Sequence, residues 1–215
     1  MIIDGKALVQ CFEVVAKCGC ELVALSTLLK NMLIKNIGMT KNTFSFVPAD
    51  KFIEKYRCSA ITDWVVTDNA FSLPLKNRDK RKKTVERYLG FQISMAGDGI
   101  ALPGQDAEPL LHIFCWDAPV EFDENYIGFP LESDEPFEVI DNRLLLWGTS
   151  DNRQWNNCTW TYSLKLVQLN TIDDLQKNVI NPVLALLSGA DVVQSLPDSL
   201  LALVYYRSKE TLLLD

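Results

Sequence analysis

His112 is the only histidine in the 215-residue chain, which excludes metal sites with several histidines and acid–base schemes that use a histidine pair. It shares one face of a predicted strand with Leu110, Phe114 and Trp116, which favours a buried structural imidazole. A serine or cysteine nucleophile with His112 as its base stays open. Against it, the chain has no Gly-x-Ser-x-Gly elbow, and Cys115 falls on the opposite face of the same strand.

The six cysteines are predicted to be reduced and structural. In Cys18-Gly19-Cys20 a single residue separates the two thiols, whereas paired zinc ligands are usually separated by two or more, and no second ligand pair accompanies them. The chain also lacks a phosphate-binding P-loop and a complete dinucleotide-binding motif, because Gly97-Asp98-Gly99 has no third glycine and no following helix. We therefore predict no cofactor and no metal. The cysteines are Cys11, Cys18, Cys20, Cys58, Cys115 and Cys158.

Acidic residues dominate the middle of the chain. Residues 88–142 contain 12 Asp and Glu and no Lys or Arg, so this acidic segment carries a formal charge of −12 while the whole chain carries −7. Large apolar residues are interspersed, so we expect it to fold with its carboxylates facing outward. Such a surface attracts basic partners. The predicted partner-binding residues are Asp117, Glu121, Asp123, Glu124, Glu132, Asp134 and Glu135.

The leading hypothesis is thus a non-enzymatic interaction protein that binds a basic protein, as an inhibitor, an immunity protein or an accessory subunit of a nucleic-acid-related complex would. One alternative is a metal-dependent phosphoesterase, because Asp98, Glu108 and Asp117 are predicted near strand ends and carboxylates bind Mg²⁺.

A basic run supports a second alternative, nucleic-acid binding. Six of the eight residues 76–83 are Lys or Arg, and Arg87 follows. The run separates two predicted strands, so we expect a long hairpin tip whose cations neutralise phosphates. The run could also pair with the acidic segment within the chain. The candidate contacts are Lys80, Arg81, Lys82 and Lys83.

Strands are predicted mainly within residues 60–169. Residues 87–95 alternate, with Leu89, Phe91 and Ile93 on one face and more polar residues on the other, while residues 110–116 are apolar on both faces, as in a central strand. Residues 61–68, 71–75, 137–148 and 160–166 are further strand candidates, with Pro74 indicating a sheet edge and Asp141-Asn142 a tight turn.

Helices are predicted at both ends. Residues 4–37 carry apolar side chains at spacings of three and four, typical of a core or dimer-facing helix, with a possible break near Gly19. A short helix is predicted over residues 48–56. Thr171 and Asp174 resemble a capping box that opens a helix through residue 188, which Pro182 should kink or interrupt. Residues 200–206 fit a strand or a buried helix.

These elements predict one α+β domain over residues 1–215, with a mostly antiparallel central sheet and helices at the two ends of the chain. The chain has no apolar run long enough to cross a bilayer and no signal-like start, so we expect a soluble cytoplasmic protein that does not act at a membrane. The partner's identity and the oligomeric state do not follow from the sequence.

Overall fold

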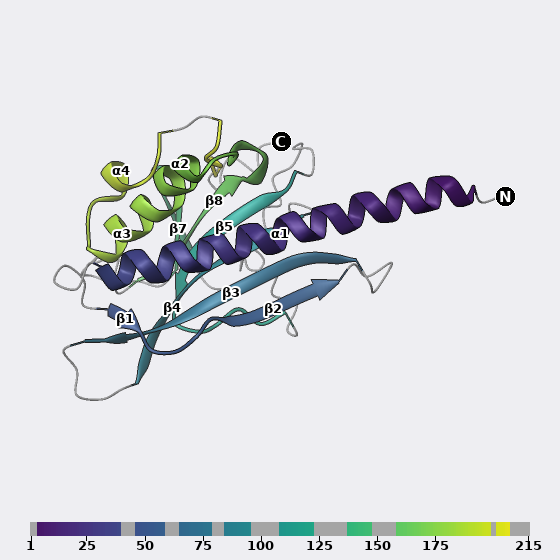
Figure 1. The fold of residues 1–215 in the computed structure, drawn as a ribbon. Helices are drawn as coiled ribbons and strands as arrows, with labels where there is room; N and C mark the ends of the chain where they lie inside the picture. Colours follow the sequence, from purple (N-terminus) through teal and green to yellow (C-terminus); the bar gives the residue numbers. More distant parts are fainter. Residues whose placement is uncertain are drawn as a thin grey trace.

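The computed structural model confirms the α+β class: one antiparallel sheet of eight strands, with a long N-terminal helix and C-terminal helices on the same face of it (Figure 1). It describes residues 4–39, 46–58, 65–78, 84–95, 108–122, 137–147, 158–198 and 201–206. No helix among these residues has the length and apolar character to span a membrane.

The strands run β1-β3-β4-β5-β8-β7-β6 across the sheet, and β2 also pairs with β3. Hairpins therefore form the centre, and β8 joins the N-terminal strands to the β6–β7 hairpin. The strand bounds are β1 Phe46–Pro48, β2 Ile53–Cys58, β3 Val66–Asn77, β4 Val85–Ser94, β5 Leu110–Trp116, β6 Phe137–Ile140, β7 Leu144–Trp147 and β8 Thr159–Lys165.

The predicted short helix over residues 48–56 is wrong, because this stretch contains the end of β1 and most of β2. Both strands pair with the outer edge of β3, and this backbone pairing overrides the helical tendency of the charged sequence. Pro74 lies inside β3, where the outer neighbour changes from β1 to β2. A missing N–H is tolerated at this gap, and the carbonyl of Pro74 accepts the N–H of Ala49 at 2.8 Å.

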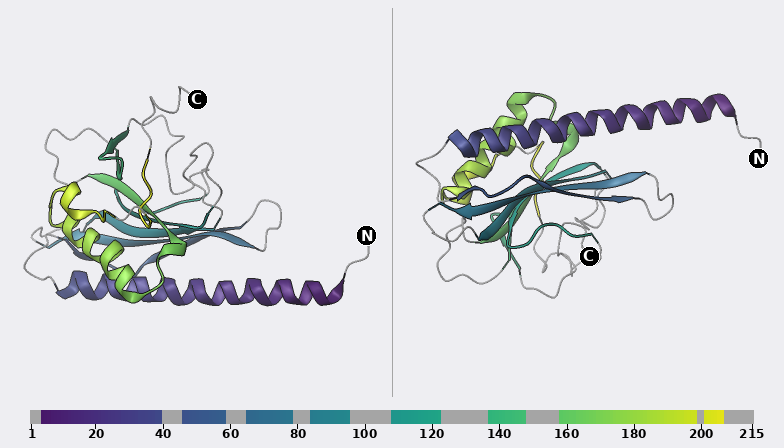
Figure 2. Two further views of the ribbon diagram at one scale, coloured as in Figure 1. Left: turned by 90° about the horizontal axis from the view of Figure 1, so that it is seen from above. Right: turned by 60° about the horizontal axis from the view of Figure 1, so that its bottom comes forward.

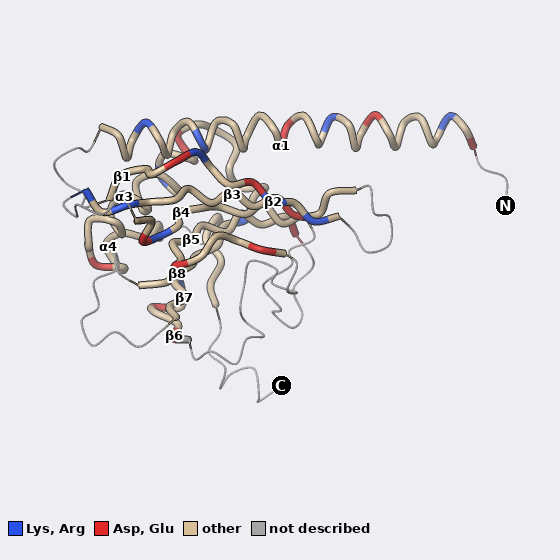
Figure 3. Tube along the Cα trace, turned by 90° about the horizontal axis from the view of Figure 1, so that it is seen from below, with Lys and Arg blue, Asp and Glu red and all other residues tan. Residues whose placement is uncertain are grey.

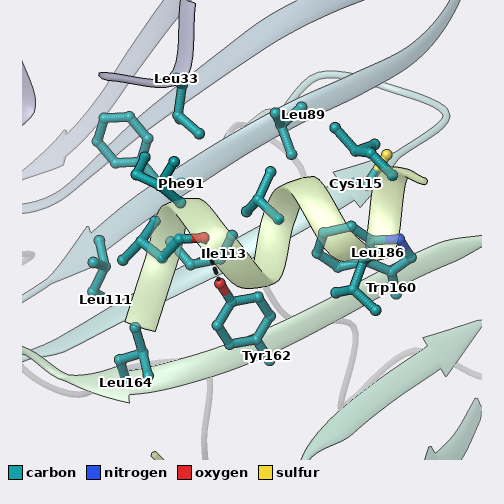
Figure 4. Close-up of a cluster of buried hydrophobic side chains, with 14 of the residues drawn as sticks. Leu33, Leu89, Phe91, Leu111, Ile113, Cys115, Trp160, Tyr162, Leu164 and Leu186 are labelled. Carbon is teal, nitrogen blue, oxygen red and sulfur yellow. Dashed lines mark hydrogen bonds between the residues drawn. The ribbon is translucent and has the colours of Figure 1, made fainter. Parts of the chain in front are cut away.

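One face of the sheet, the helix-covered face, carries the main hydrophobic core. The alternation predicted for residues 87–95 is confirmed: Leu89, Phe91 and Ile93 of β4 are fully buried here. Phe91 stacks on Phe71 of β3 with a ring-centroid distance of 4.8 Å. Figure 4 shows how side chains from β4, β5 and β8 meet beneath a C-terminal helix that contributes Leu186.

The N-terminal helix α1, Gly5–Met39, is continuous through Gly19, so the predicted break does not occur. Its second half lies on the helix-covered face, where Leu29, Leu33 and Ile37 are buried in the core. Lys30 lies over the Phe71 ring, 4.8 Å from its centroid, and pairs with Glu54 at 2.6 Å. The N-terminal end of α1 extends beyond the sheet (Figures 1 and 2).

The C-terminal helical run begins at the predicted capping box: the Thr171 side chain accepts the N–H of Asp174, and the Asp174 carboxylate accepts the N–H of Thr171. Pro182 interrupts regular α-helix as predicted, because a π-helical turn precedes it. Gly189, with φ of +83°, ends the run. The elements are α2 Ile172–Leu175, the π-turn η4 Gln176–Ile180 and α3 Asn181–Leu187; a 3-10 turn, η3 Leu166–Gln168, precedes them, and α4 Val192–Ser195 follows.

The β6–β7 hairpin turns at Asp141 and Asn142, as predicted, and both residues have positive φ, the backbone of a type I′ turn. Residues 201–206 form neither a regular strand nor a helix. After a turn at residues 201–202, the chain runs beside β8, with one bridge between Leu203 and Leu164 and a bond from the Val204 N–H to the Ser163 carbonyl at 2.9 Å.

Candidate functional site

The second face of the sheet, opposite the helix-covered face, collects the polar side chains that could do chemistry. The sequence predicts a wetter face here from the alternation in β4, and the polar character is confirmed. The face is nevertheless covered, since Gln92, Ser94 and His112 are all fully buried. The buried polar residues of this face are Asp68, Ser72, Gln92, Ser94, His112, Thr161 and Ser163.

His112 lies in the middle of β5 directly opposite Ser163 of β8. Its Nδ1 is 2.8 Å from the Ser163 Oγ, and this Oγ is 2.6 Å from the hydroxyl of Tyr206 in the extended C-terminal segment. The predicted burial of the imidazole is confirmed. The arrangement is therefore a polar chain that links two strands to residues 201–206.

The same chain contains the components of a serine nucleophile and its base. Its geometry does not favour that chemistry, because Ser163 is fully buried and its Oγ already contacts both His112 and Tyr206. Cys115 lies on the opposite face in the main core, as the strand period predicts. Burial raises the pKa of its thiol to about 12, so the thiol stays protonated at neutral pH.

A second buried polar cluster lies on β2, β3 and β4. The Asp68 carboxylate is 1% exposed and pairs with the Arg57 guanidinium at 3.0 Å. Its oxygens also accept the Thr67 hydroxyl at 3.0 Å and the Gln92 amide at 3.3 Å. Among the described residues, Gln92 Oε1 and Ser94 Oγ have no hydrogen-bond partner. These contacts satisfy the buried charge of Asp68, which makes a structural role the simplest interpretation.

Residues 117–122 of the acidic segment lie across this second face of the sheet. Asp117 follows β5 directly and is exposed. The Val120 N–H then donates to Ser72 of β3 at 3.2 Å, and Glu121 pairs with Lys55 of β2 at 2.6 Å. The chain therefore passes from β5 over β4 and β3 toward β2. The other predicted partner-binding residues, Asp123, Glu124, Glu132, Asp134 and Glu135, lie outside the described residues.

Several carboxylates of the acidic segment form ion pairs with cations from elsewhere in the chain. Besides the Glu121–Lys55 pair, Glu108 pairs with Lys165 at 2.7 Å, and Asp141 pairs with the buried Arg143, which also binds Asp198 at 2.7 Å. In the part of the chain that the structure describes, three cations that pair with this segment therefore lie outside the basic run: Lys55, Arg143 and Lys165.

The carboxylate cluster considered for metal binding is not assembled in the described part of the fold. Glu108 and Asp117 flank opposite ends of β5, which places them on the order of 20 Å or more apart along the strand. Asp98 lies outside the described residues. Within the described ranges, no three His, Cys, Asp or Glu side chains come close enough to hold a metal ion.

The basic run connects β3 to β4, which pair as an antiparallel hairpin, so the predicted hairpin position is confirmed. Arg78 is exposed at the start of the connection, while Arg87 on β4 donates to the Thr159 hydroxyl at 3.2 Å. Figure 3 shows the Lys and Arg positions among the described strands and helices. The candidate contacts Lys80, Arg81, Lys82 and Lys83 lie outside the described residues.

Sequence reasoning missed Asp68, Ser163 and Tyr206 as members of the buried polar clusters. Their partners lie on neighbouring strands or in the C-terminal segment, far away in sequence, so no local spacing identifies them.

The chain matches no known protein-family model, no curated protein and no solved structure.

Proposed function

We propose that the chain is a non-enzymatic interaction protein whose acidic surface binds a basic protein partner. The observation that carries the proposal is the charge of −12 over residues 88–142, in a chain whose other residues together sum to +5, that is −7 minus −12. Where this segment is described, Asp117, Glu121 and Glu138 are exposed at the surface. Unlike the His112–Ser163 chain, these carboxylates are accessible to a partner.

Aromatic side chains beside the carboxylates supply anchors for such a partner. Trp116 and Phe122 flank the exposed Asp117 and Glu121, and both are only half-buried against a small cluster around Phe114 and Val120. Partly exposed aromatics next to charged residues are common at the centres of protein interfaces, where they contribute most of the binding energy. The carboxylates would attract a basic partner and speed its association, and the aromatic side chains would contribute most of the affinity.

A partner of this chemistry is a protein with a strongly basic surface, such as one that itself binds nucleic acid. Blocking that surface would make the chain an inhibitor or immunity-like protein, and docking beside it would make the chain an accessory subunit. Both roles use the same acidic surface. They differ in whether the partner retains its own activity when bound.

The first experiment is affinity capture by the full chain from native lysate at 50 mM and 500 mM salt. Captured proteins are identified by mass spectrometry, and nucleic acid by the 260/280 nm absorbance ratio. The proposal predicts a stoichiometric basic protein that is lost at the higher salt, because screening weakens contacts between exposed charges. Capture of nucleic acid without a basic protein would contradict it.

Nucleic-acid binding is the second candidate function, because the basic run connects two strands of a confirmed hairpin. Here the test is retention of a labelled single- or double-stranded oligonucleotide over a salt titration. Binding should fall steeply with salt and disappear when Lys80, Arg81, Lys82 and Lys83 are replaced by Ala. Retention by that variant would exclude the hairpin as the contact.

A further inference from the structure

Three polar residues adjoin one another on the second face of the sheet, where β3 pairs with β4. Asp68 of β3 lies directly opposite Ser94 of β4, and Gln92 lies two residues before Ser94 on the same face. The Gln92 Nε2 donates to the Asp68 Oδ1 at 3.3 Å. This bond turns the Gln92 amide toward the end of β4 that carries Ser94. We call the Asp68 Oδ1, the Gln92 Oε1 and the Ser94 Oγ the oxygen site.

Two of these three oxygen atoms are buried without a partner. Gln92 and Ser94 are both 0% exposed, and within the described ranges neither the Gln92 Oε1 nor the Ser94 Oγ makes a hydrogen bond. A buried polar atom that loses its bonds to water and gains none in the fold destabilises the native state. Native proteins therefore pair nearly all such atoms, either with protein groups or with ordered water.

The third oxygen atom has room for one more donor. The other oxygen of Asp68, Oδ2, is bound by the Arg57 Nη2 at 3.0 Å, the Arg57 Nε at 3.2 Å and the Thr67 hydroxyl at 3.0 Å. The Oδ1 accepts the Gln92 amide at 3.3 Å, which is long for a hydrogen bond. Each oxygen of an ionised carboxylate has lone pairs for about two donors, so Oδ1 can accept a second one.

Charge restricts what the oxygen site can bind. The Arg57 guanidinium already balances the buried carboxylate of Asp68, so a bound cation would add a buried positive charge with no counter-charge. Three protein oxygens are also fewer than the six to eight or so that Ca²⁺ takes. A neutral molecule fits the site if it can donate to two acceptors, the Asp68 Oδ1 and the Gln92 Oε1, and accept from one hydroxyl.

We propose that the oxygen site binds one internal water molecule, which donates to the Asp68 Oδ1 and the Gln92 Oε1 and accepts the Ser94 hydroxyl. Three hydrogen bonds are about the average for a buried water, and such waters occur at polar groups that the protein itself leaves unpaired. Short side chains on both strands favour a water-sized space here, because Ala70 lies directly opposite Gln92 and ends at its methyl group.

The water would connect β3 to β4 through side chains, in addition to their backbone pairing. It would also fix the Gln92 amide, with Nε2 toward Asp68 and Oε1 toward the water. Gln92 lies directly opposite His112 of β5, so the site is placed between the Asp68 cluster and the polar chain that runs from His112 to Tyr206.

The test compares the thermal midpoint of Ser94→Ala with that of its parent in two backgrounds of the full chain, wild type and Gln92→Leu. If a water joins the two residues, Ser94→Ala removes one of its hydrogen bonds in the wild type. We expect the midpoint to fall by about 2–4 °C, as loss of one net hydrogen bond gives for a chain of this size. Without the water, Ser94→Ala only removes an unpaired buried hydroxyl, which leaves the midpoint unchanged or raises it.

The Gln92→Leu background is the matched control. The Ser94 Oγ bonds directly to no described residue, so the water is the link through which the two substitutions can interact. With Leu at position 92 the water loses one of its two acceptors, and the fall caused by Ser94→Ala should disappear. The same shift in both backgrounds would overturn the proposal, as would a Ser94→Ala that is as stable as wild type or more stable.

Two further measurements do not depend on the folding of the Gln92→Leu variants. A crystal structure of the wild-type chain, at a resolution that shows ordered waters, should place one within hydrogen-bond distance of all three oxygen atoms, and a site filled by protein atoms would overturn the proposal. The wild-type midpoint should also be the same in sodium, potassium and choline chloride at equal concentration. A midpoint raised only by sodium or potassium would assign the site to a cation instead of water.

Discussion

The hydroxyl of Tyr162 donates to the backbone carbonyl of Asn178 at 3.2 Å. In a regular α-helix, this carbonyl would accept a hydrogen bond from the N–H of residue 182. Pro182 has no N–H. The same hydroxyl lies 3.3 Å from the carbonyl of Val179, within the π-helical turn (Figure 4). A strand residue therefore supplies a donor that the helix lost to its proline, and this fixes the C-terminal helices on the sheet.

Replacing Tyr162 by Phe should lower the free energy of unfolding by about 1–3 kcal/mol, because it removes the hydroxyl that donates to the buried carbonyl of Asn178 while keeping the ring. Urea denaturation measures the change. Tyr56→Phe is the matched control, since the Tyr56 side chain is 70% exposed and its hydroxyl can bond water. Equal stability of Tyr162→Phe and Tyr56→Phe would contradict the bond's role.

Alkaline pH should destabilise the protein through its buried tyrosines. Burial raises the pKa of both Tyr162 and Tyr206 above the ordinary value, so the native state keeps protons that the unfolded chain releases near pH 10. Their contribution to stability is complete below about pH 10 and is lost as the pH rises beyond it. Urea midpoints between pH 8 and 11 test this, and Tyr162→Phe should show a shallower decline than wild type.

Gly90 of β4 should not tolerate a side chain. A Cβ there would overlap the backbone oxygen of Phe71 and the ring of Phe114, which lies opposite on β5. Gly90→Ala should therefore destabilise the fold by about 1–3 kcal/mol, as overpacked core substitutions do. Gly19→Ala, in open space on α1, should instead stabilise by up to about 1 kcal/mol. Thermal melts of both variants at low protein concentration give the comparison.

Five of the six thiols should divide by burial, and the sixth, Cys58, is intermediate. Cys115 and Cys158 are buried, and the raised pKa of Cys115, about 12, keeps its thiol protonated. In dilute native protein, iodoacetamide should therefore modify Cys11, Cys18 and Cys20 quickly and spare the buried pair until urea is added. Peptide mass spectrometry assigns the adducts. Rapid native modification of Cys115 would contradict the core described around β5.

Local periodicity was sufficient to predict the centre of the sheet. The alternation of Leu89, Phe91 and Ile93 and the apolar run of β5 are period-two signals that hold whatever surrounds them. The capping box at Thr171 and the turn at Asp141-Asn142 are equally local, because each depends on residues within one turn of chain.

Tertiary pairing explains what the sequence did not predict. Glu54, Lys55 and Arg57 have no strand-like alternation, and β2 exists because the edge of β3 binds its backbone. The polar chain from His112 through Ser163 to Tyr206 joins residues about 50 and 40 positions apart, so it is invisible to spacing rules. The N-terminal end of α1 has the same limit, since one continuous apolar pattern does not reveal where the sheet beneath the helix ends.

The most direct measurement compares two charge-reversal variants for binding to the basic protein captured by the wild type. One variant carries Asp134→Lys and Glu135→Lys in the acidic segment, and the other carries Glu13→Lys and Asp50→Lys outside it, so both change the net charge equally. Isothermal titration calorimetry at 50 mM salt should show affinity at least ten-fold weaker for the first variant and near wild type for the second. Equal affinities for both variants would mean that the acidic segment is not the binding surface.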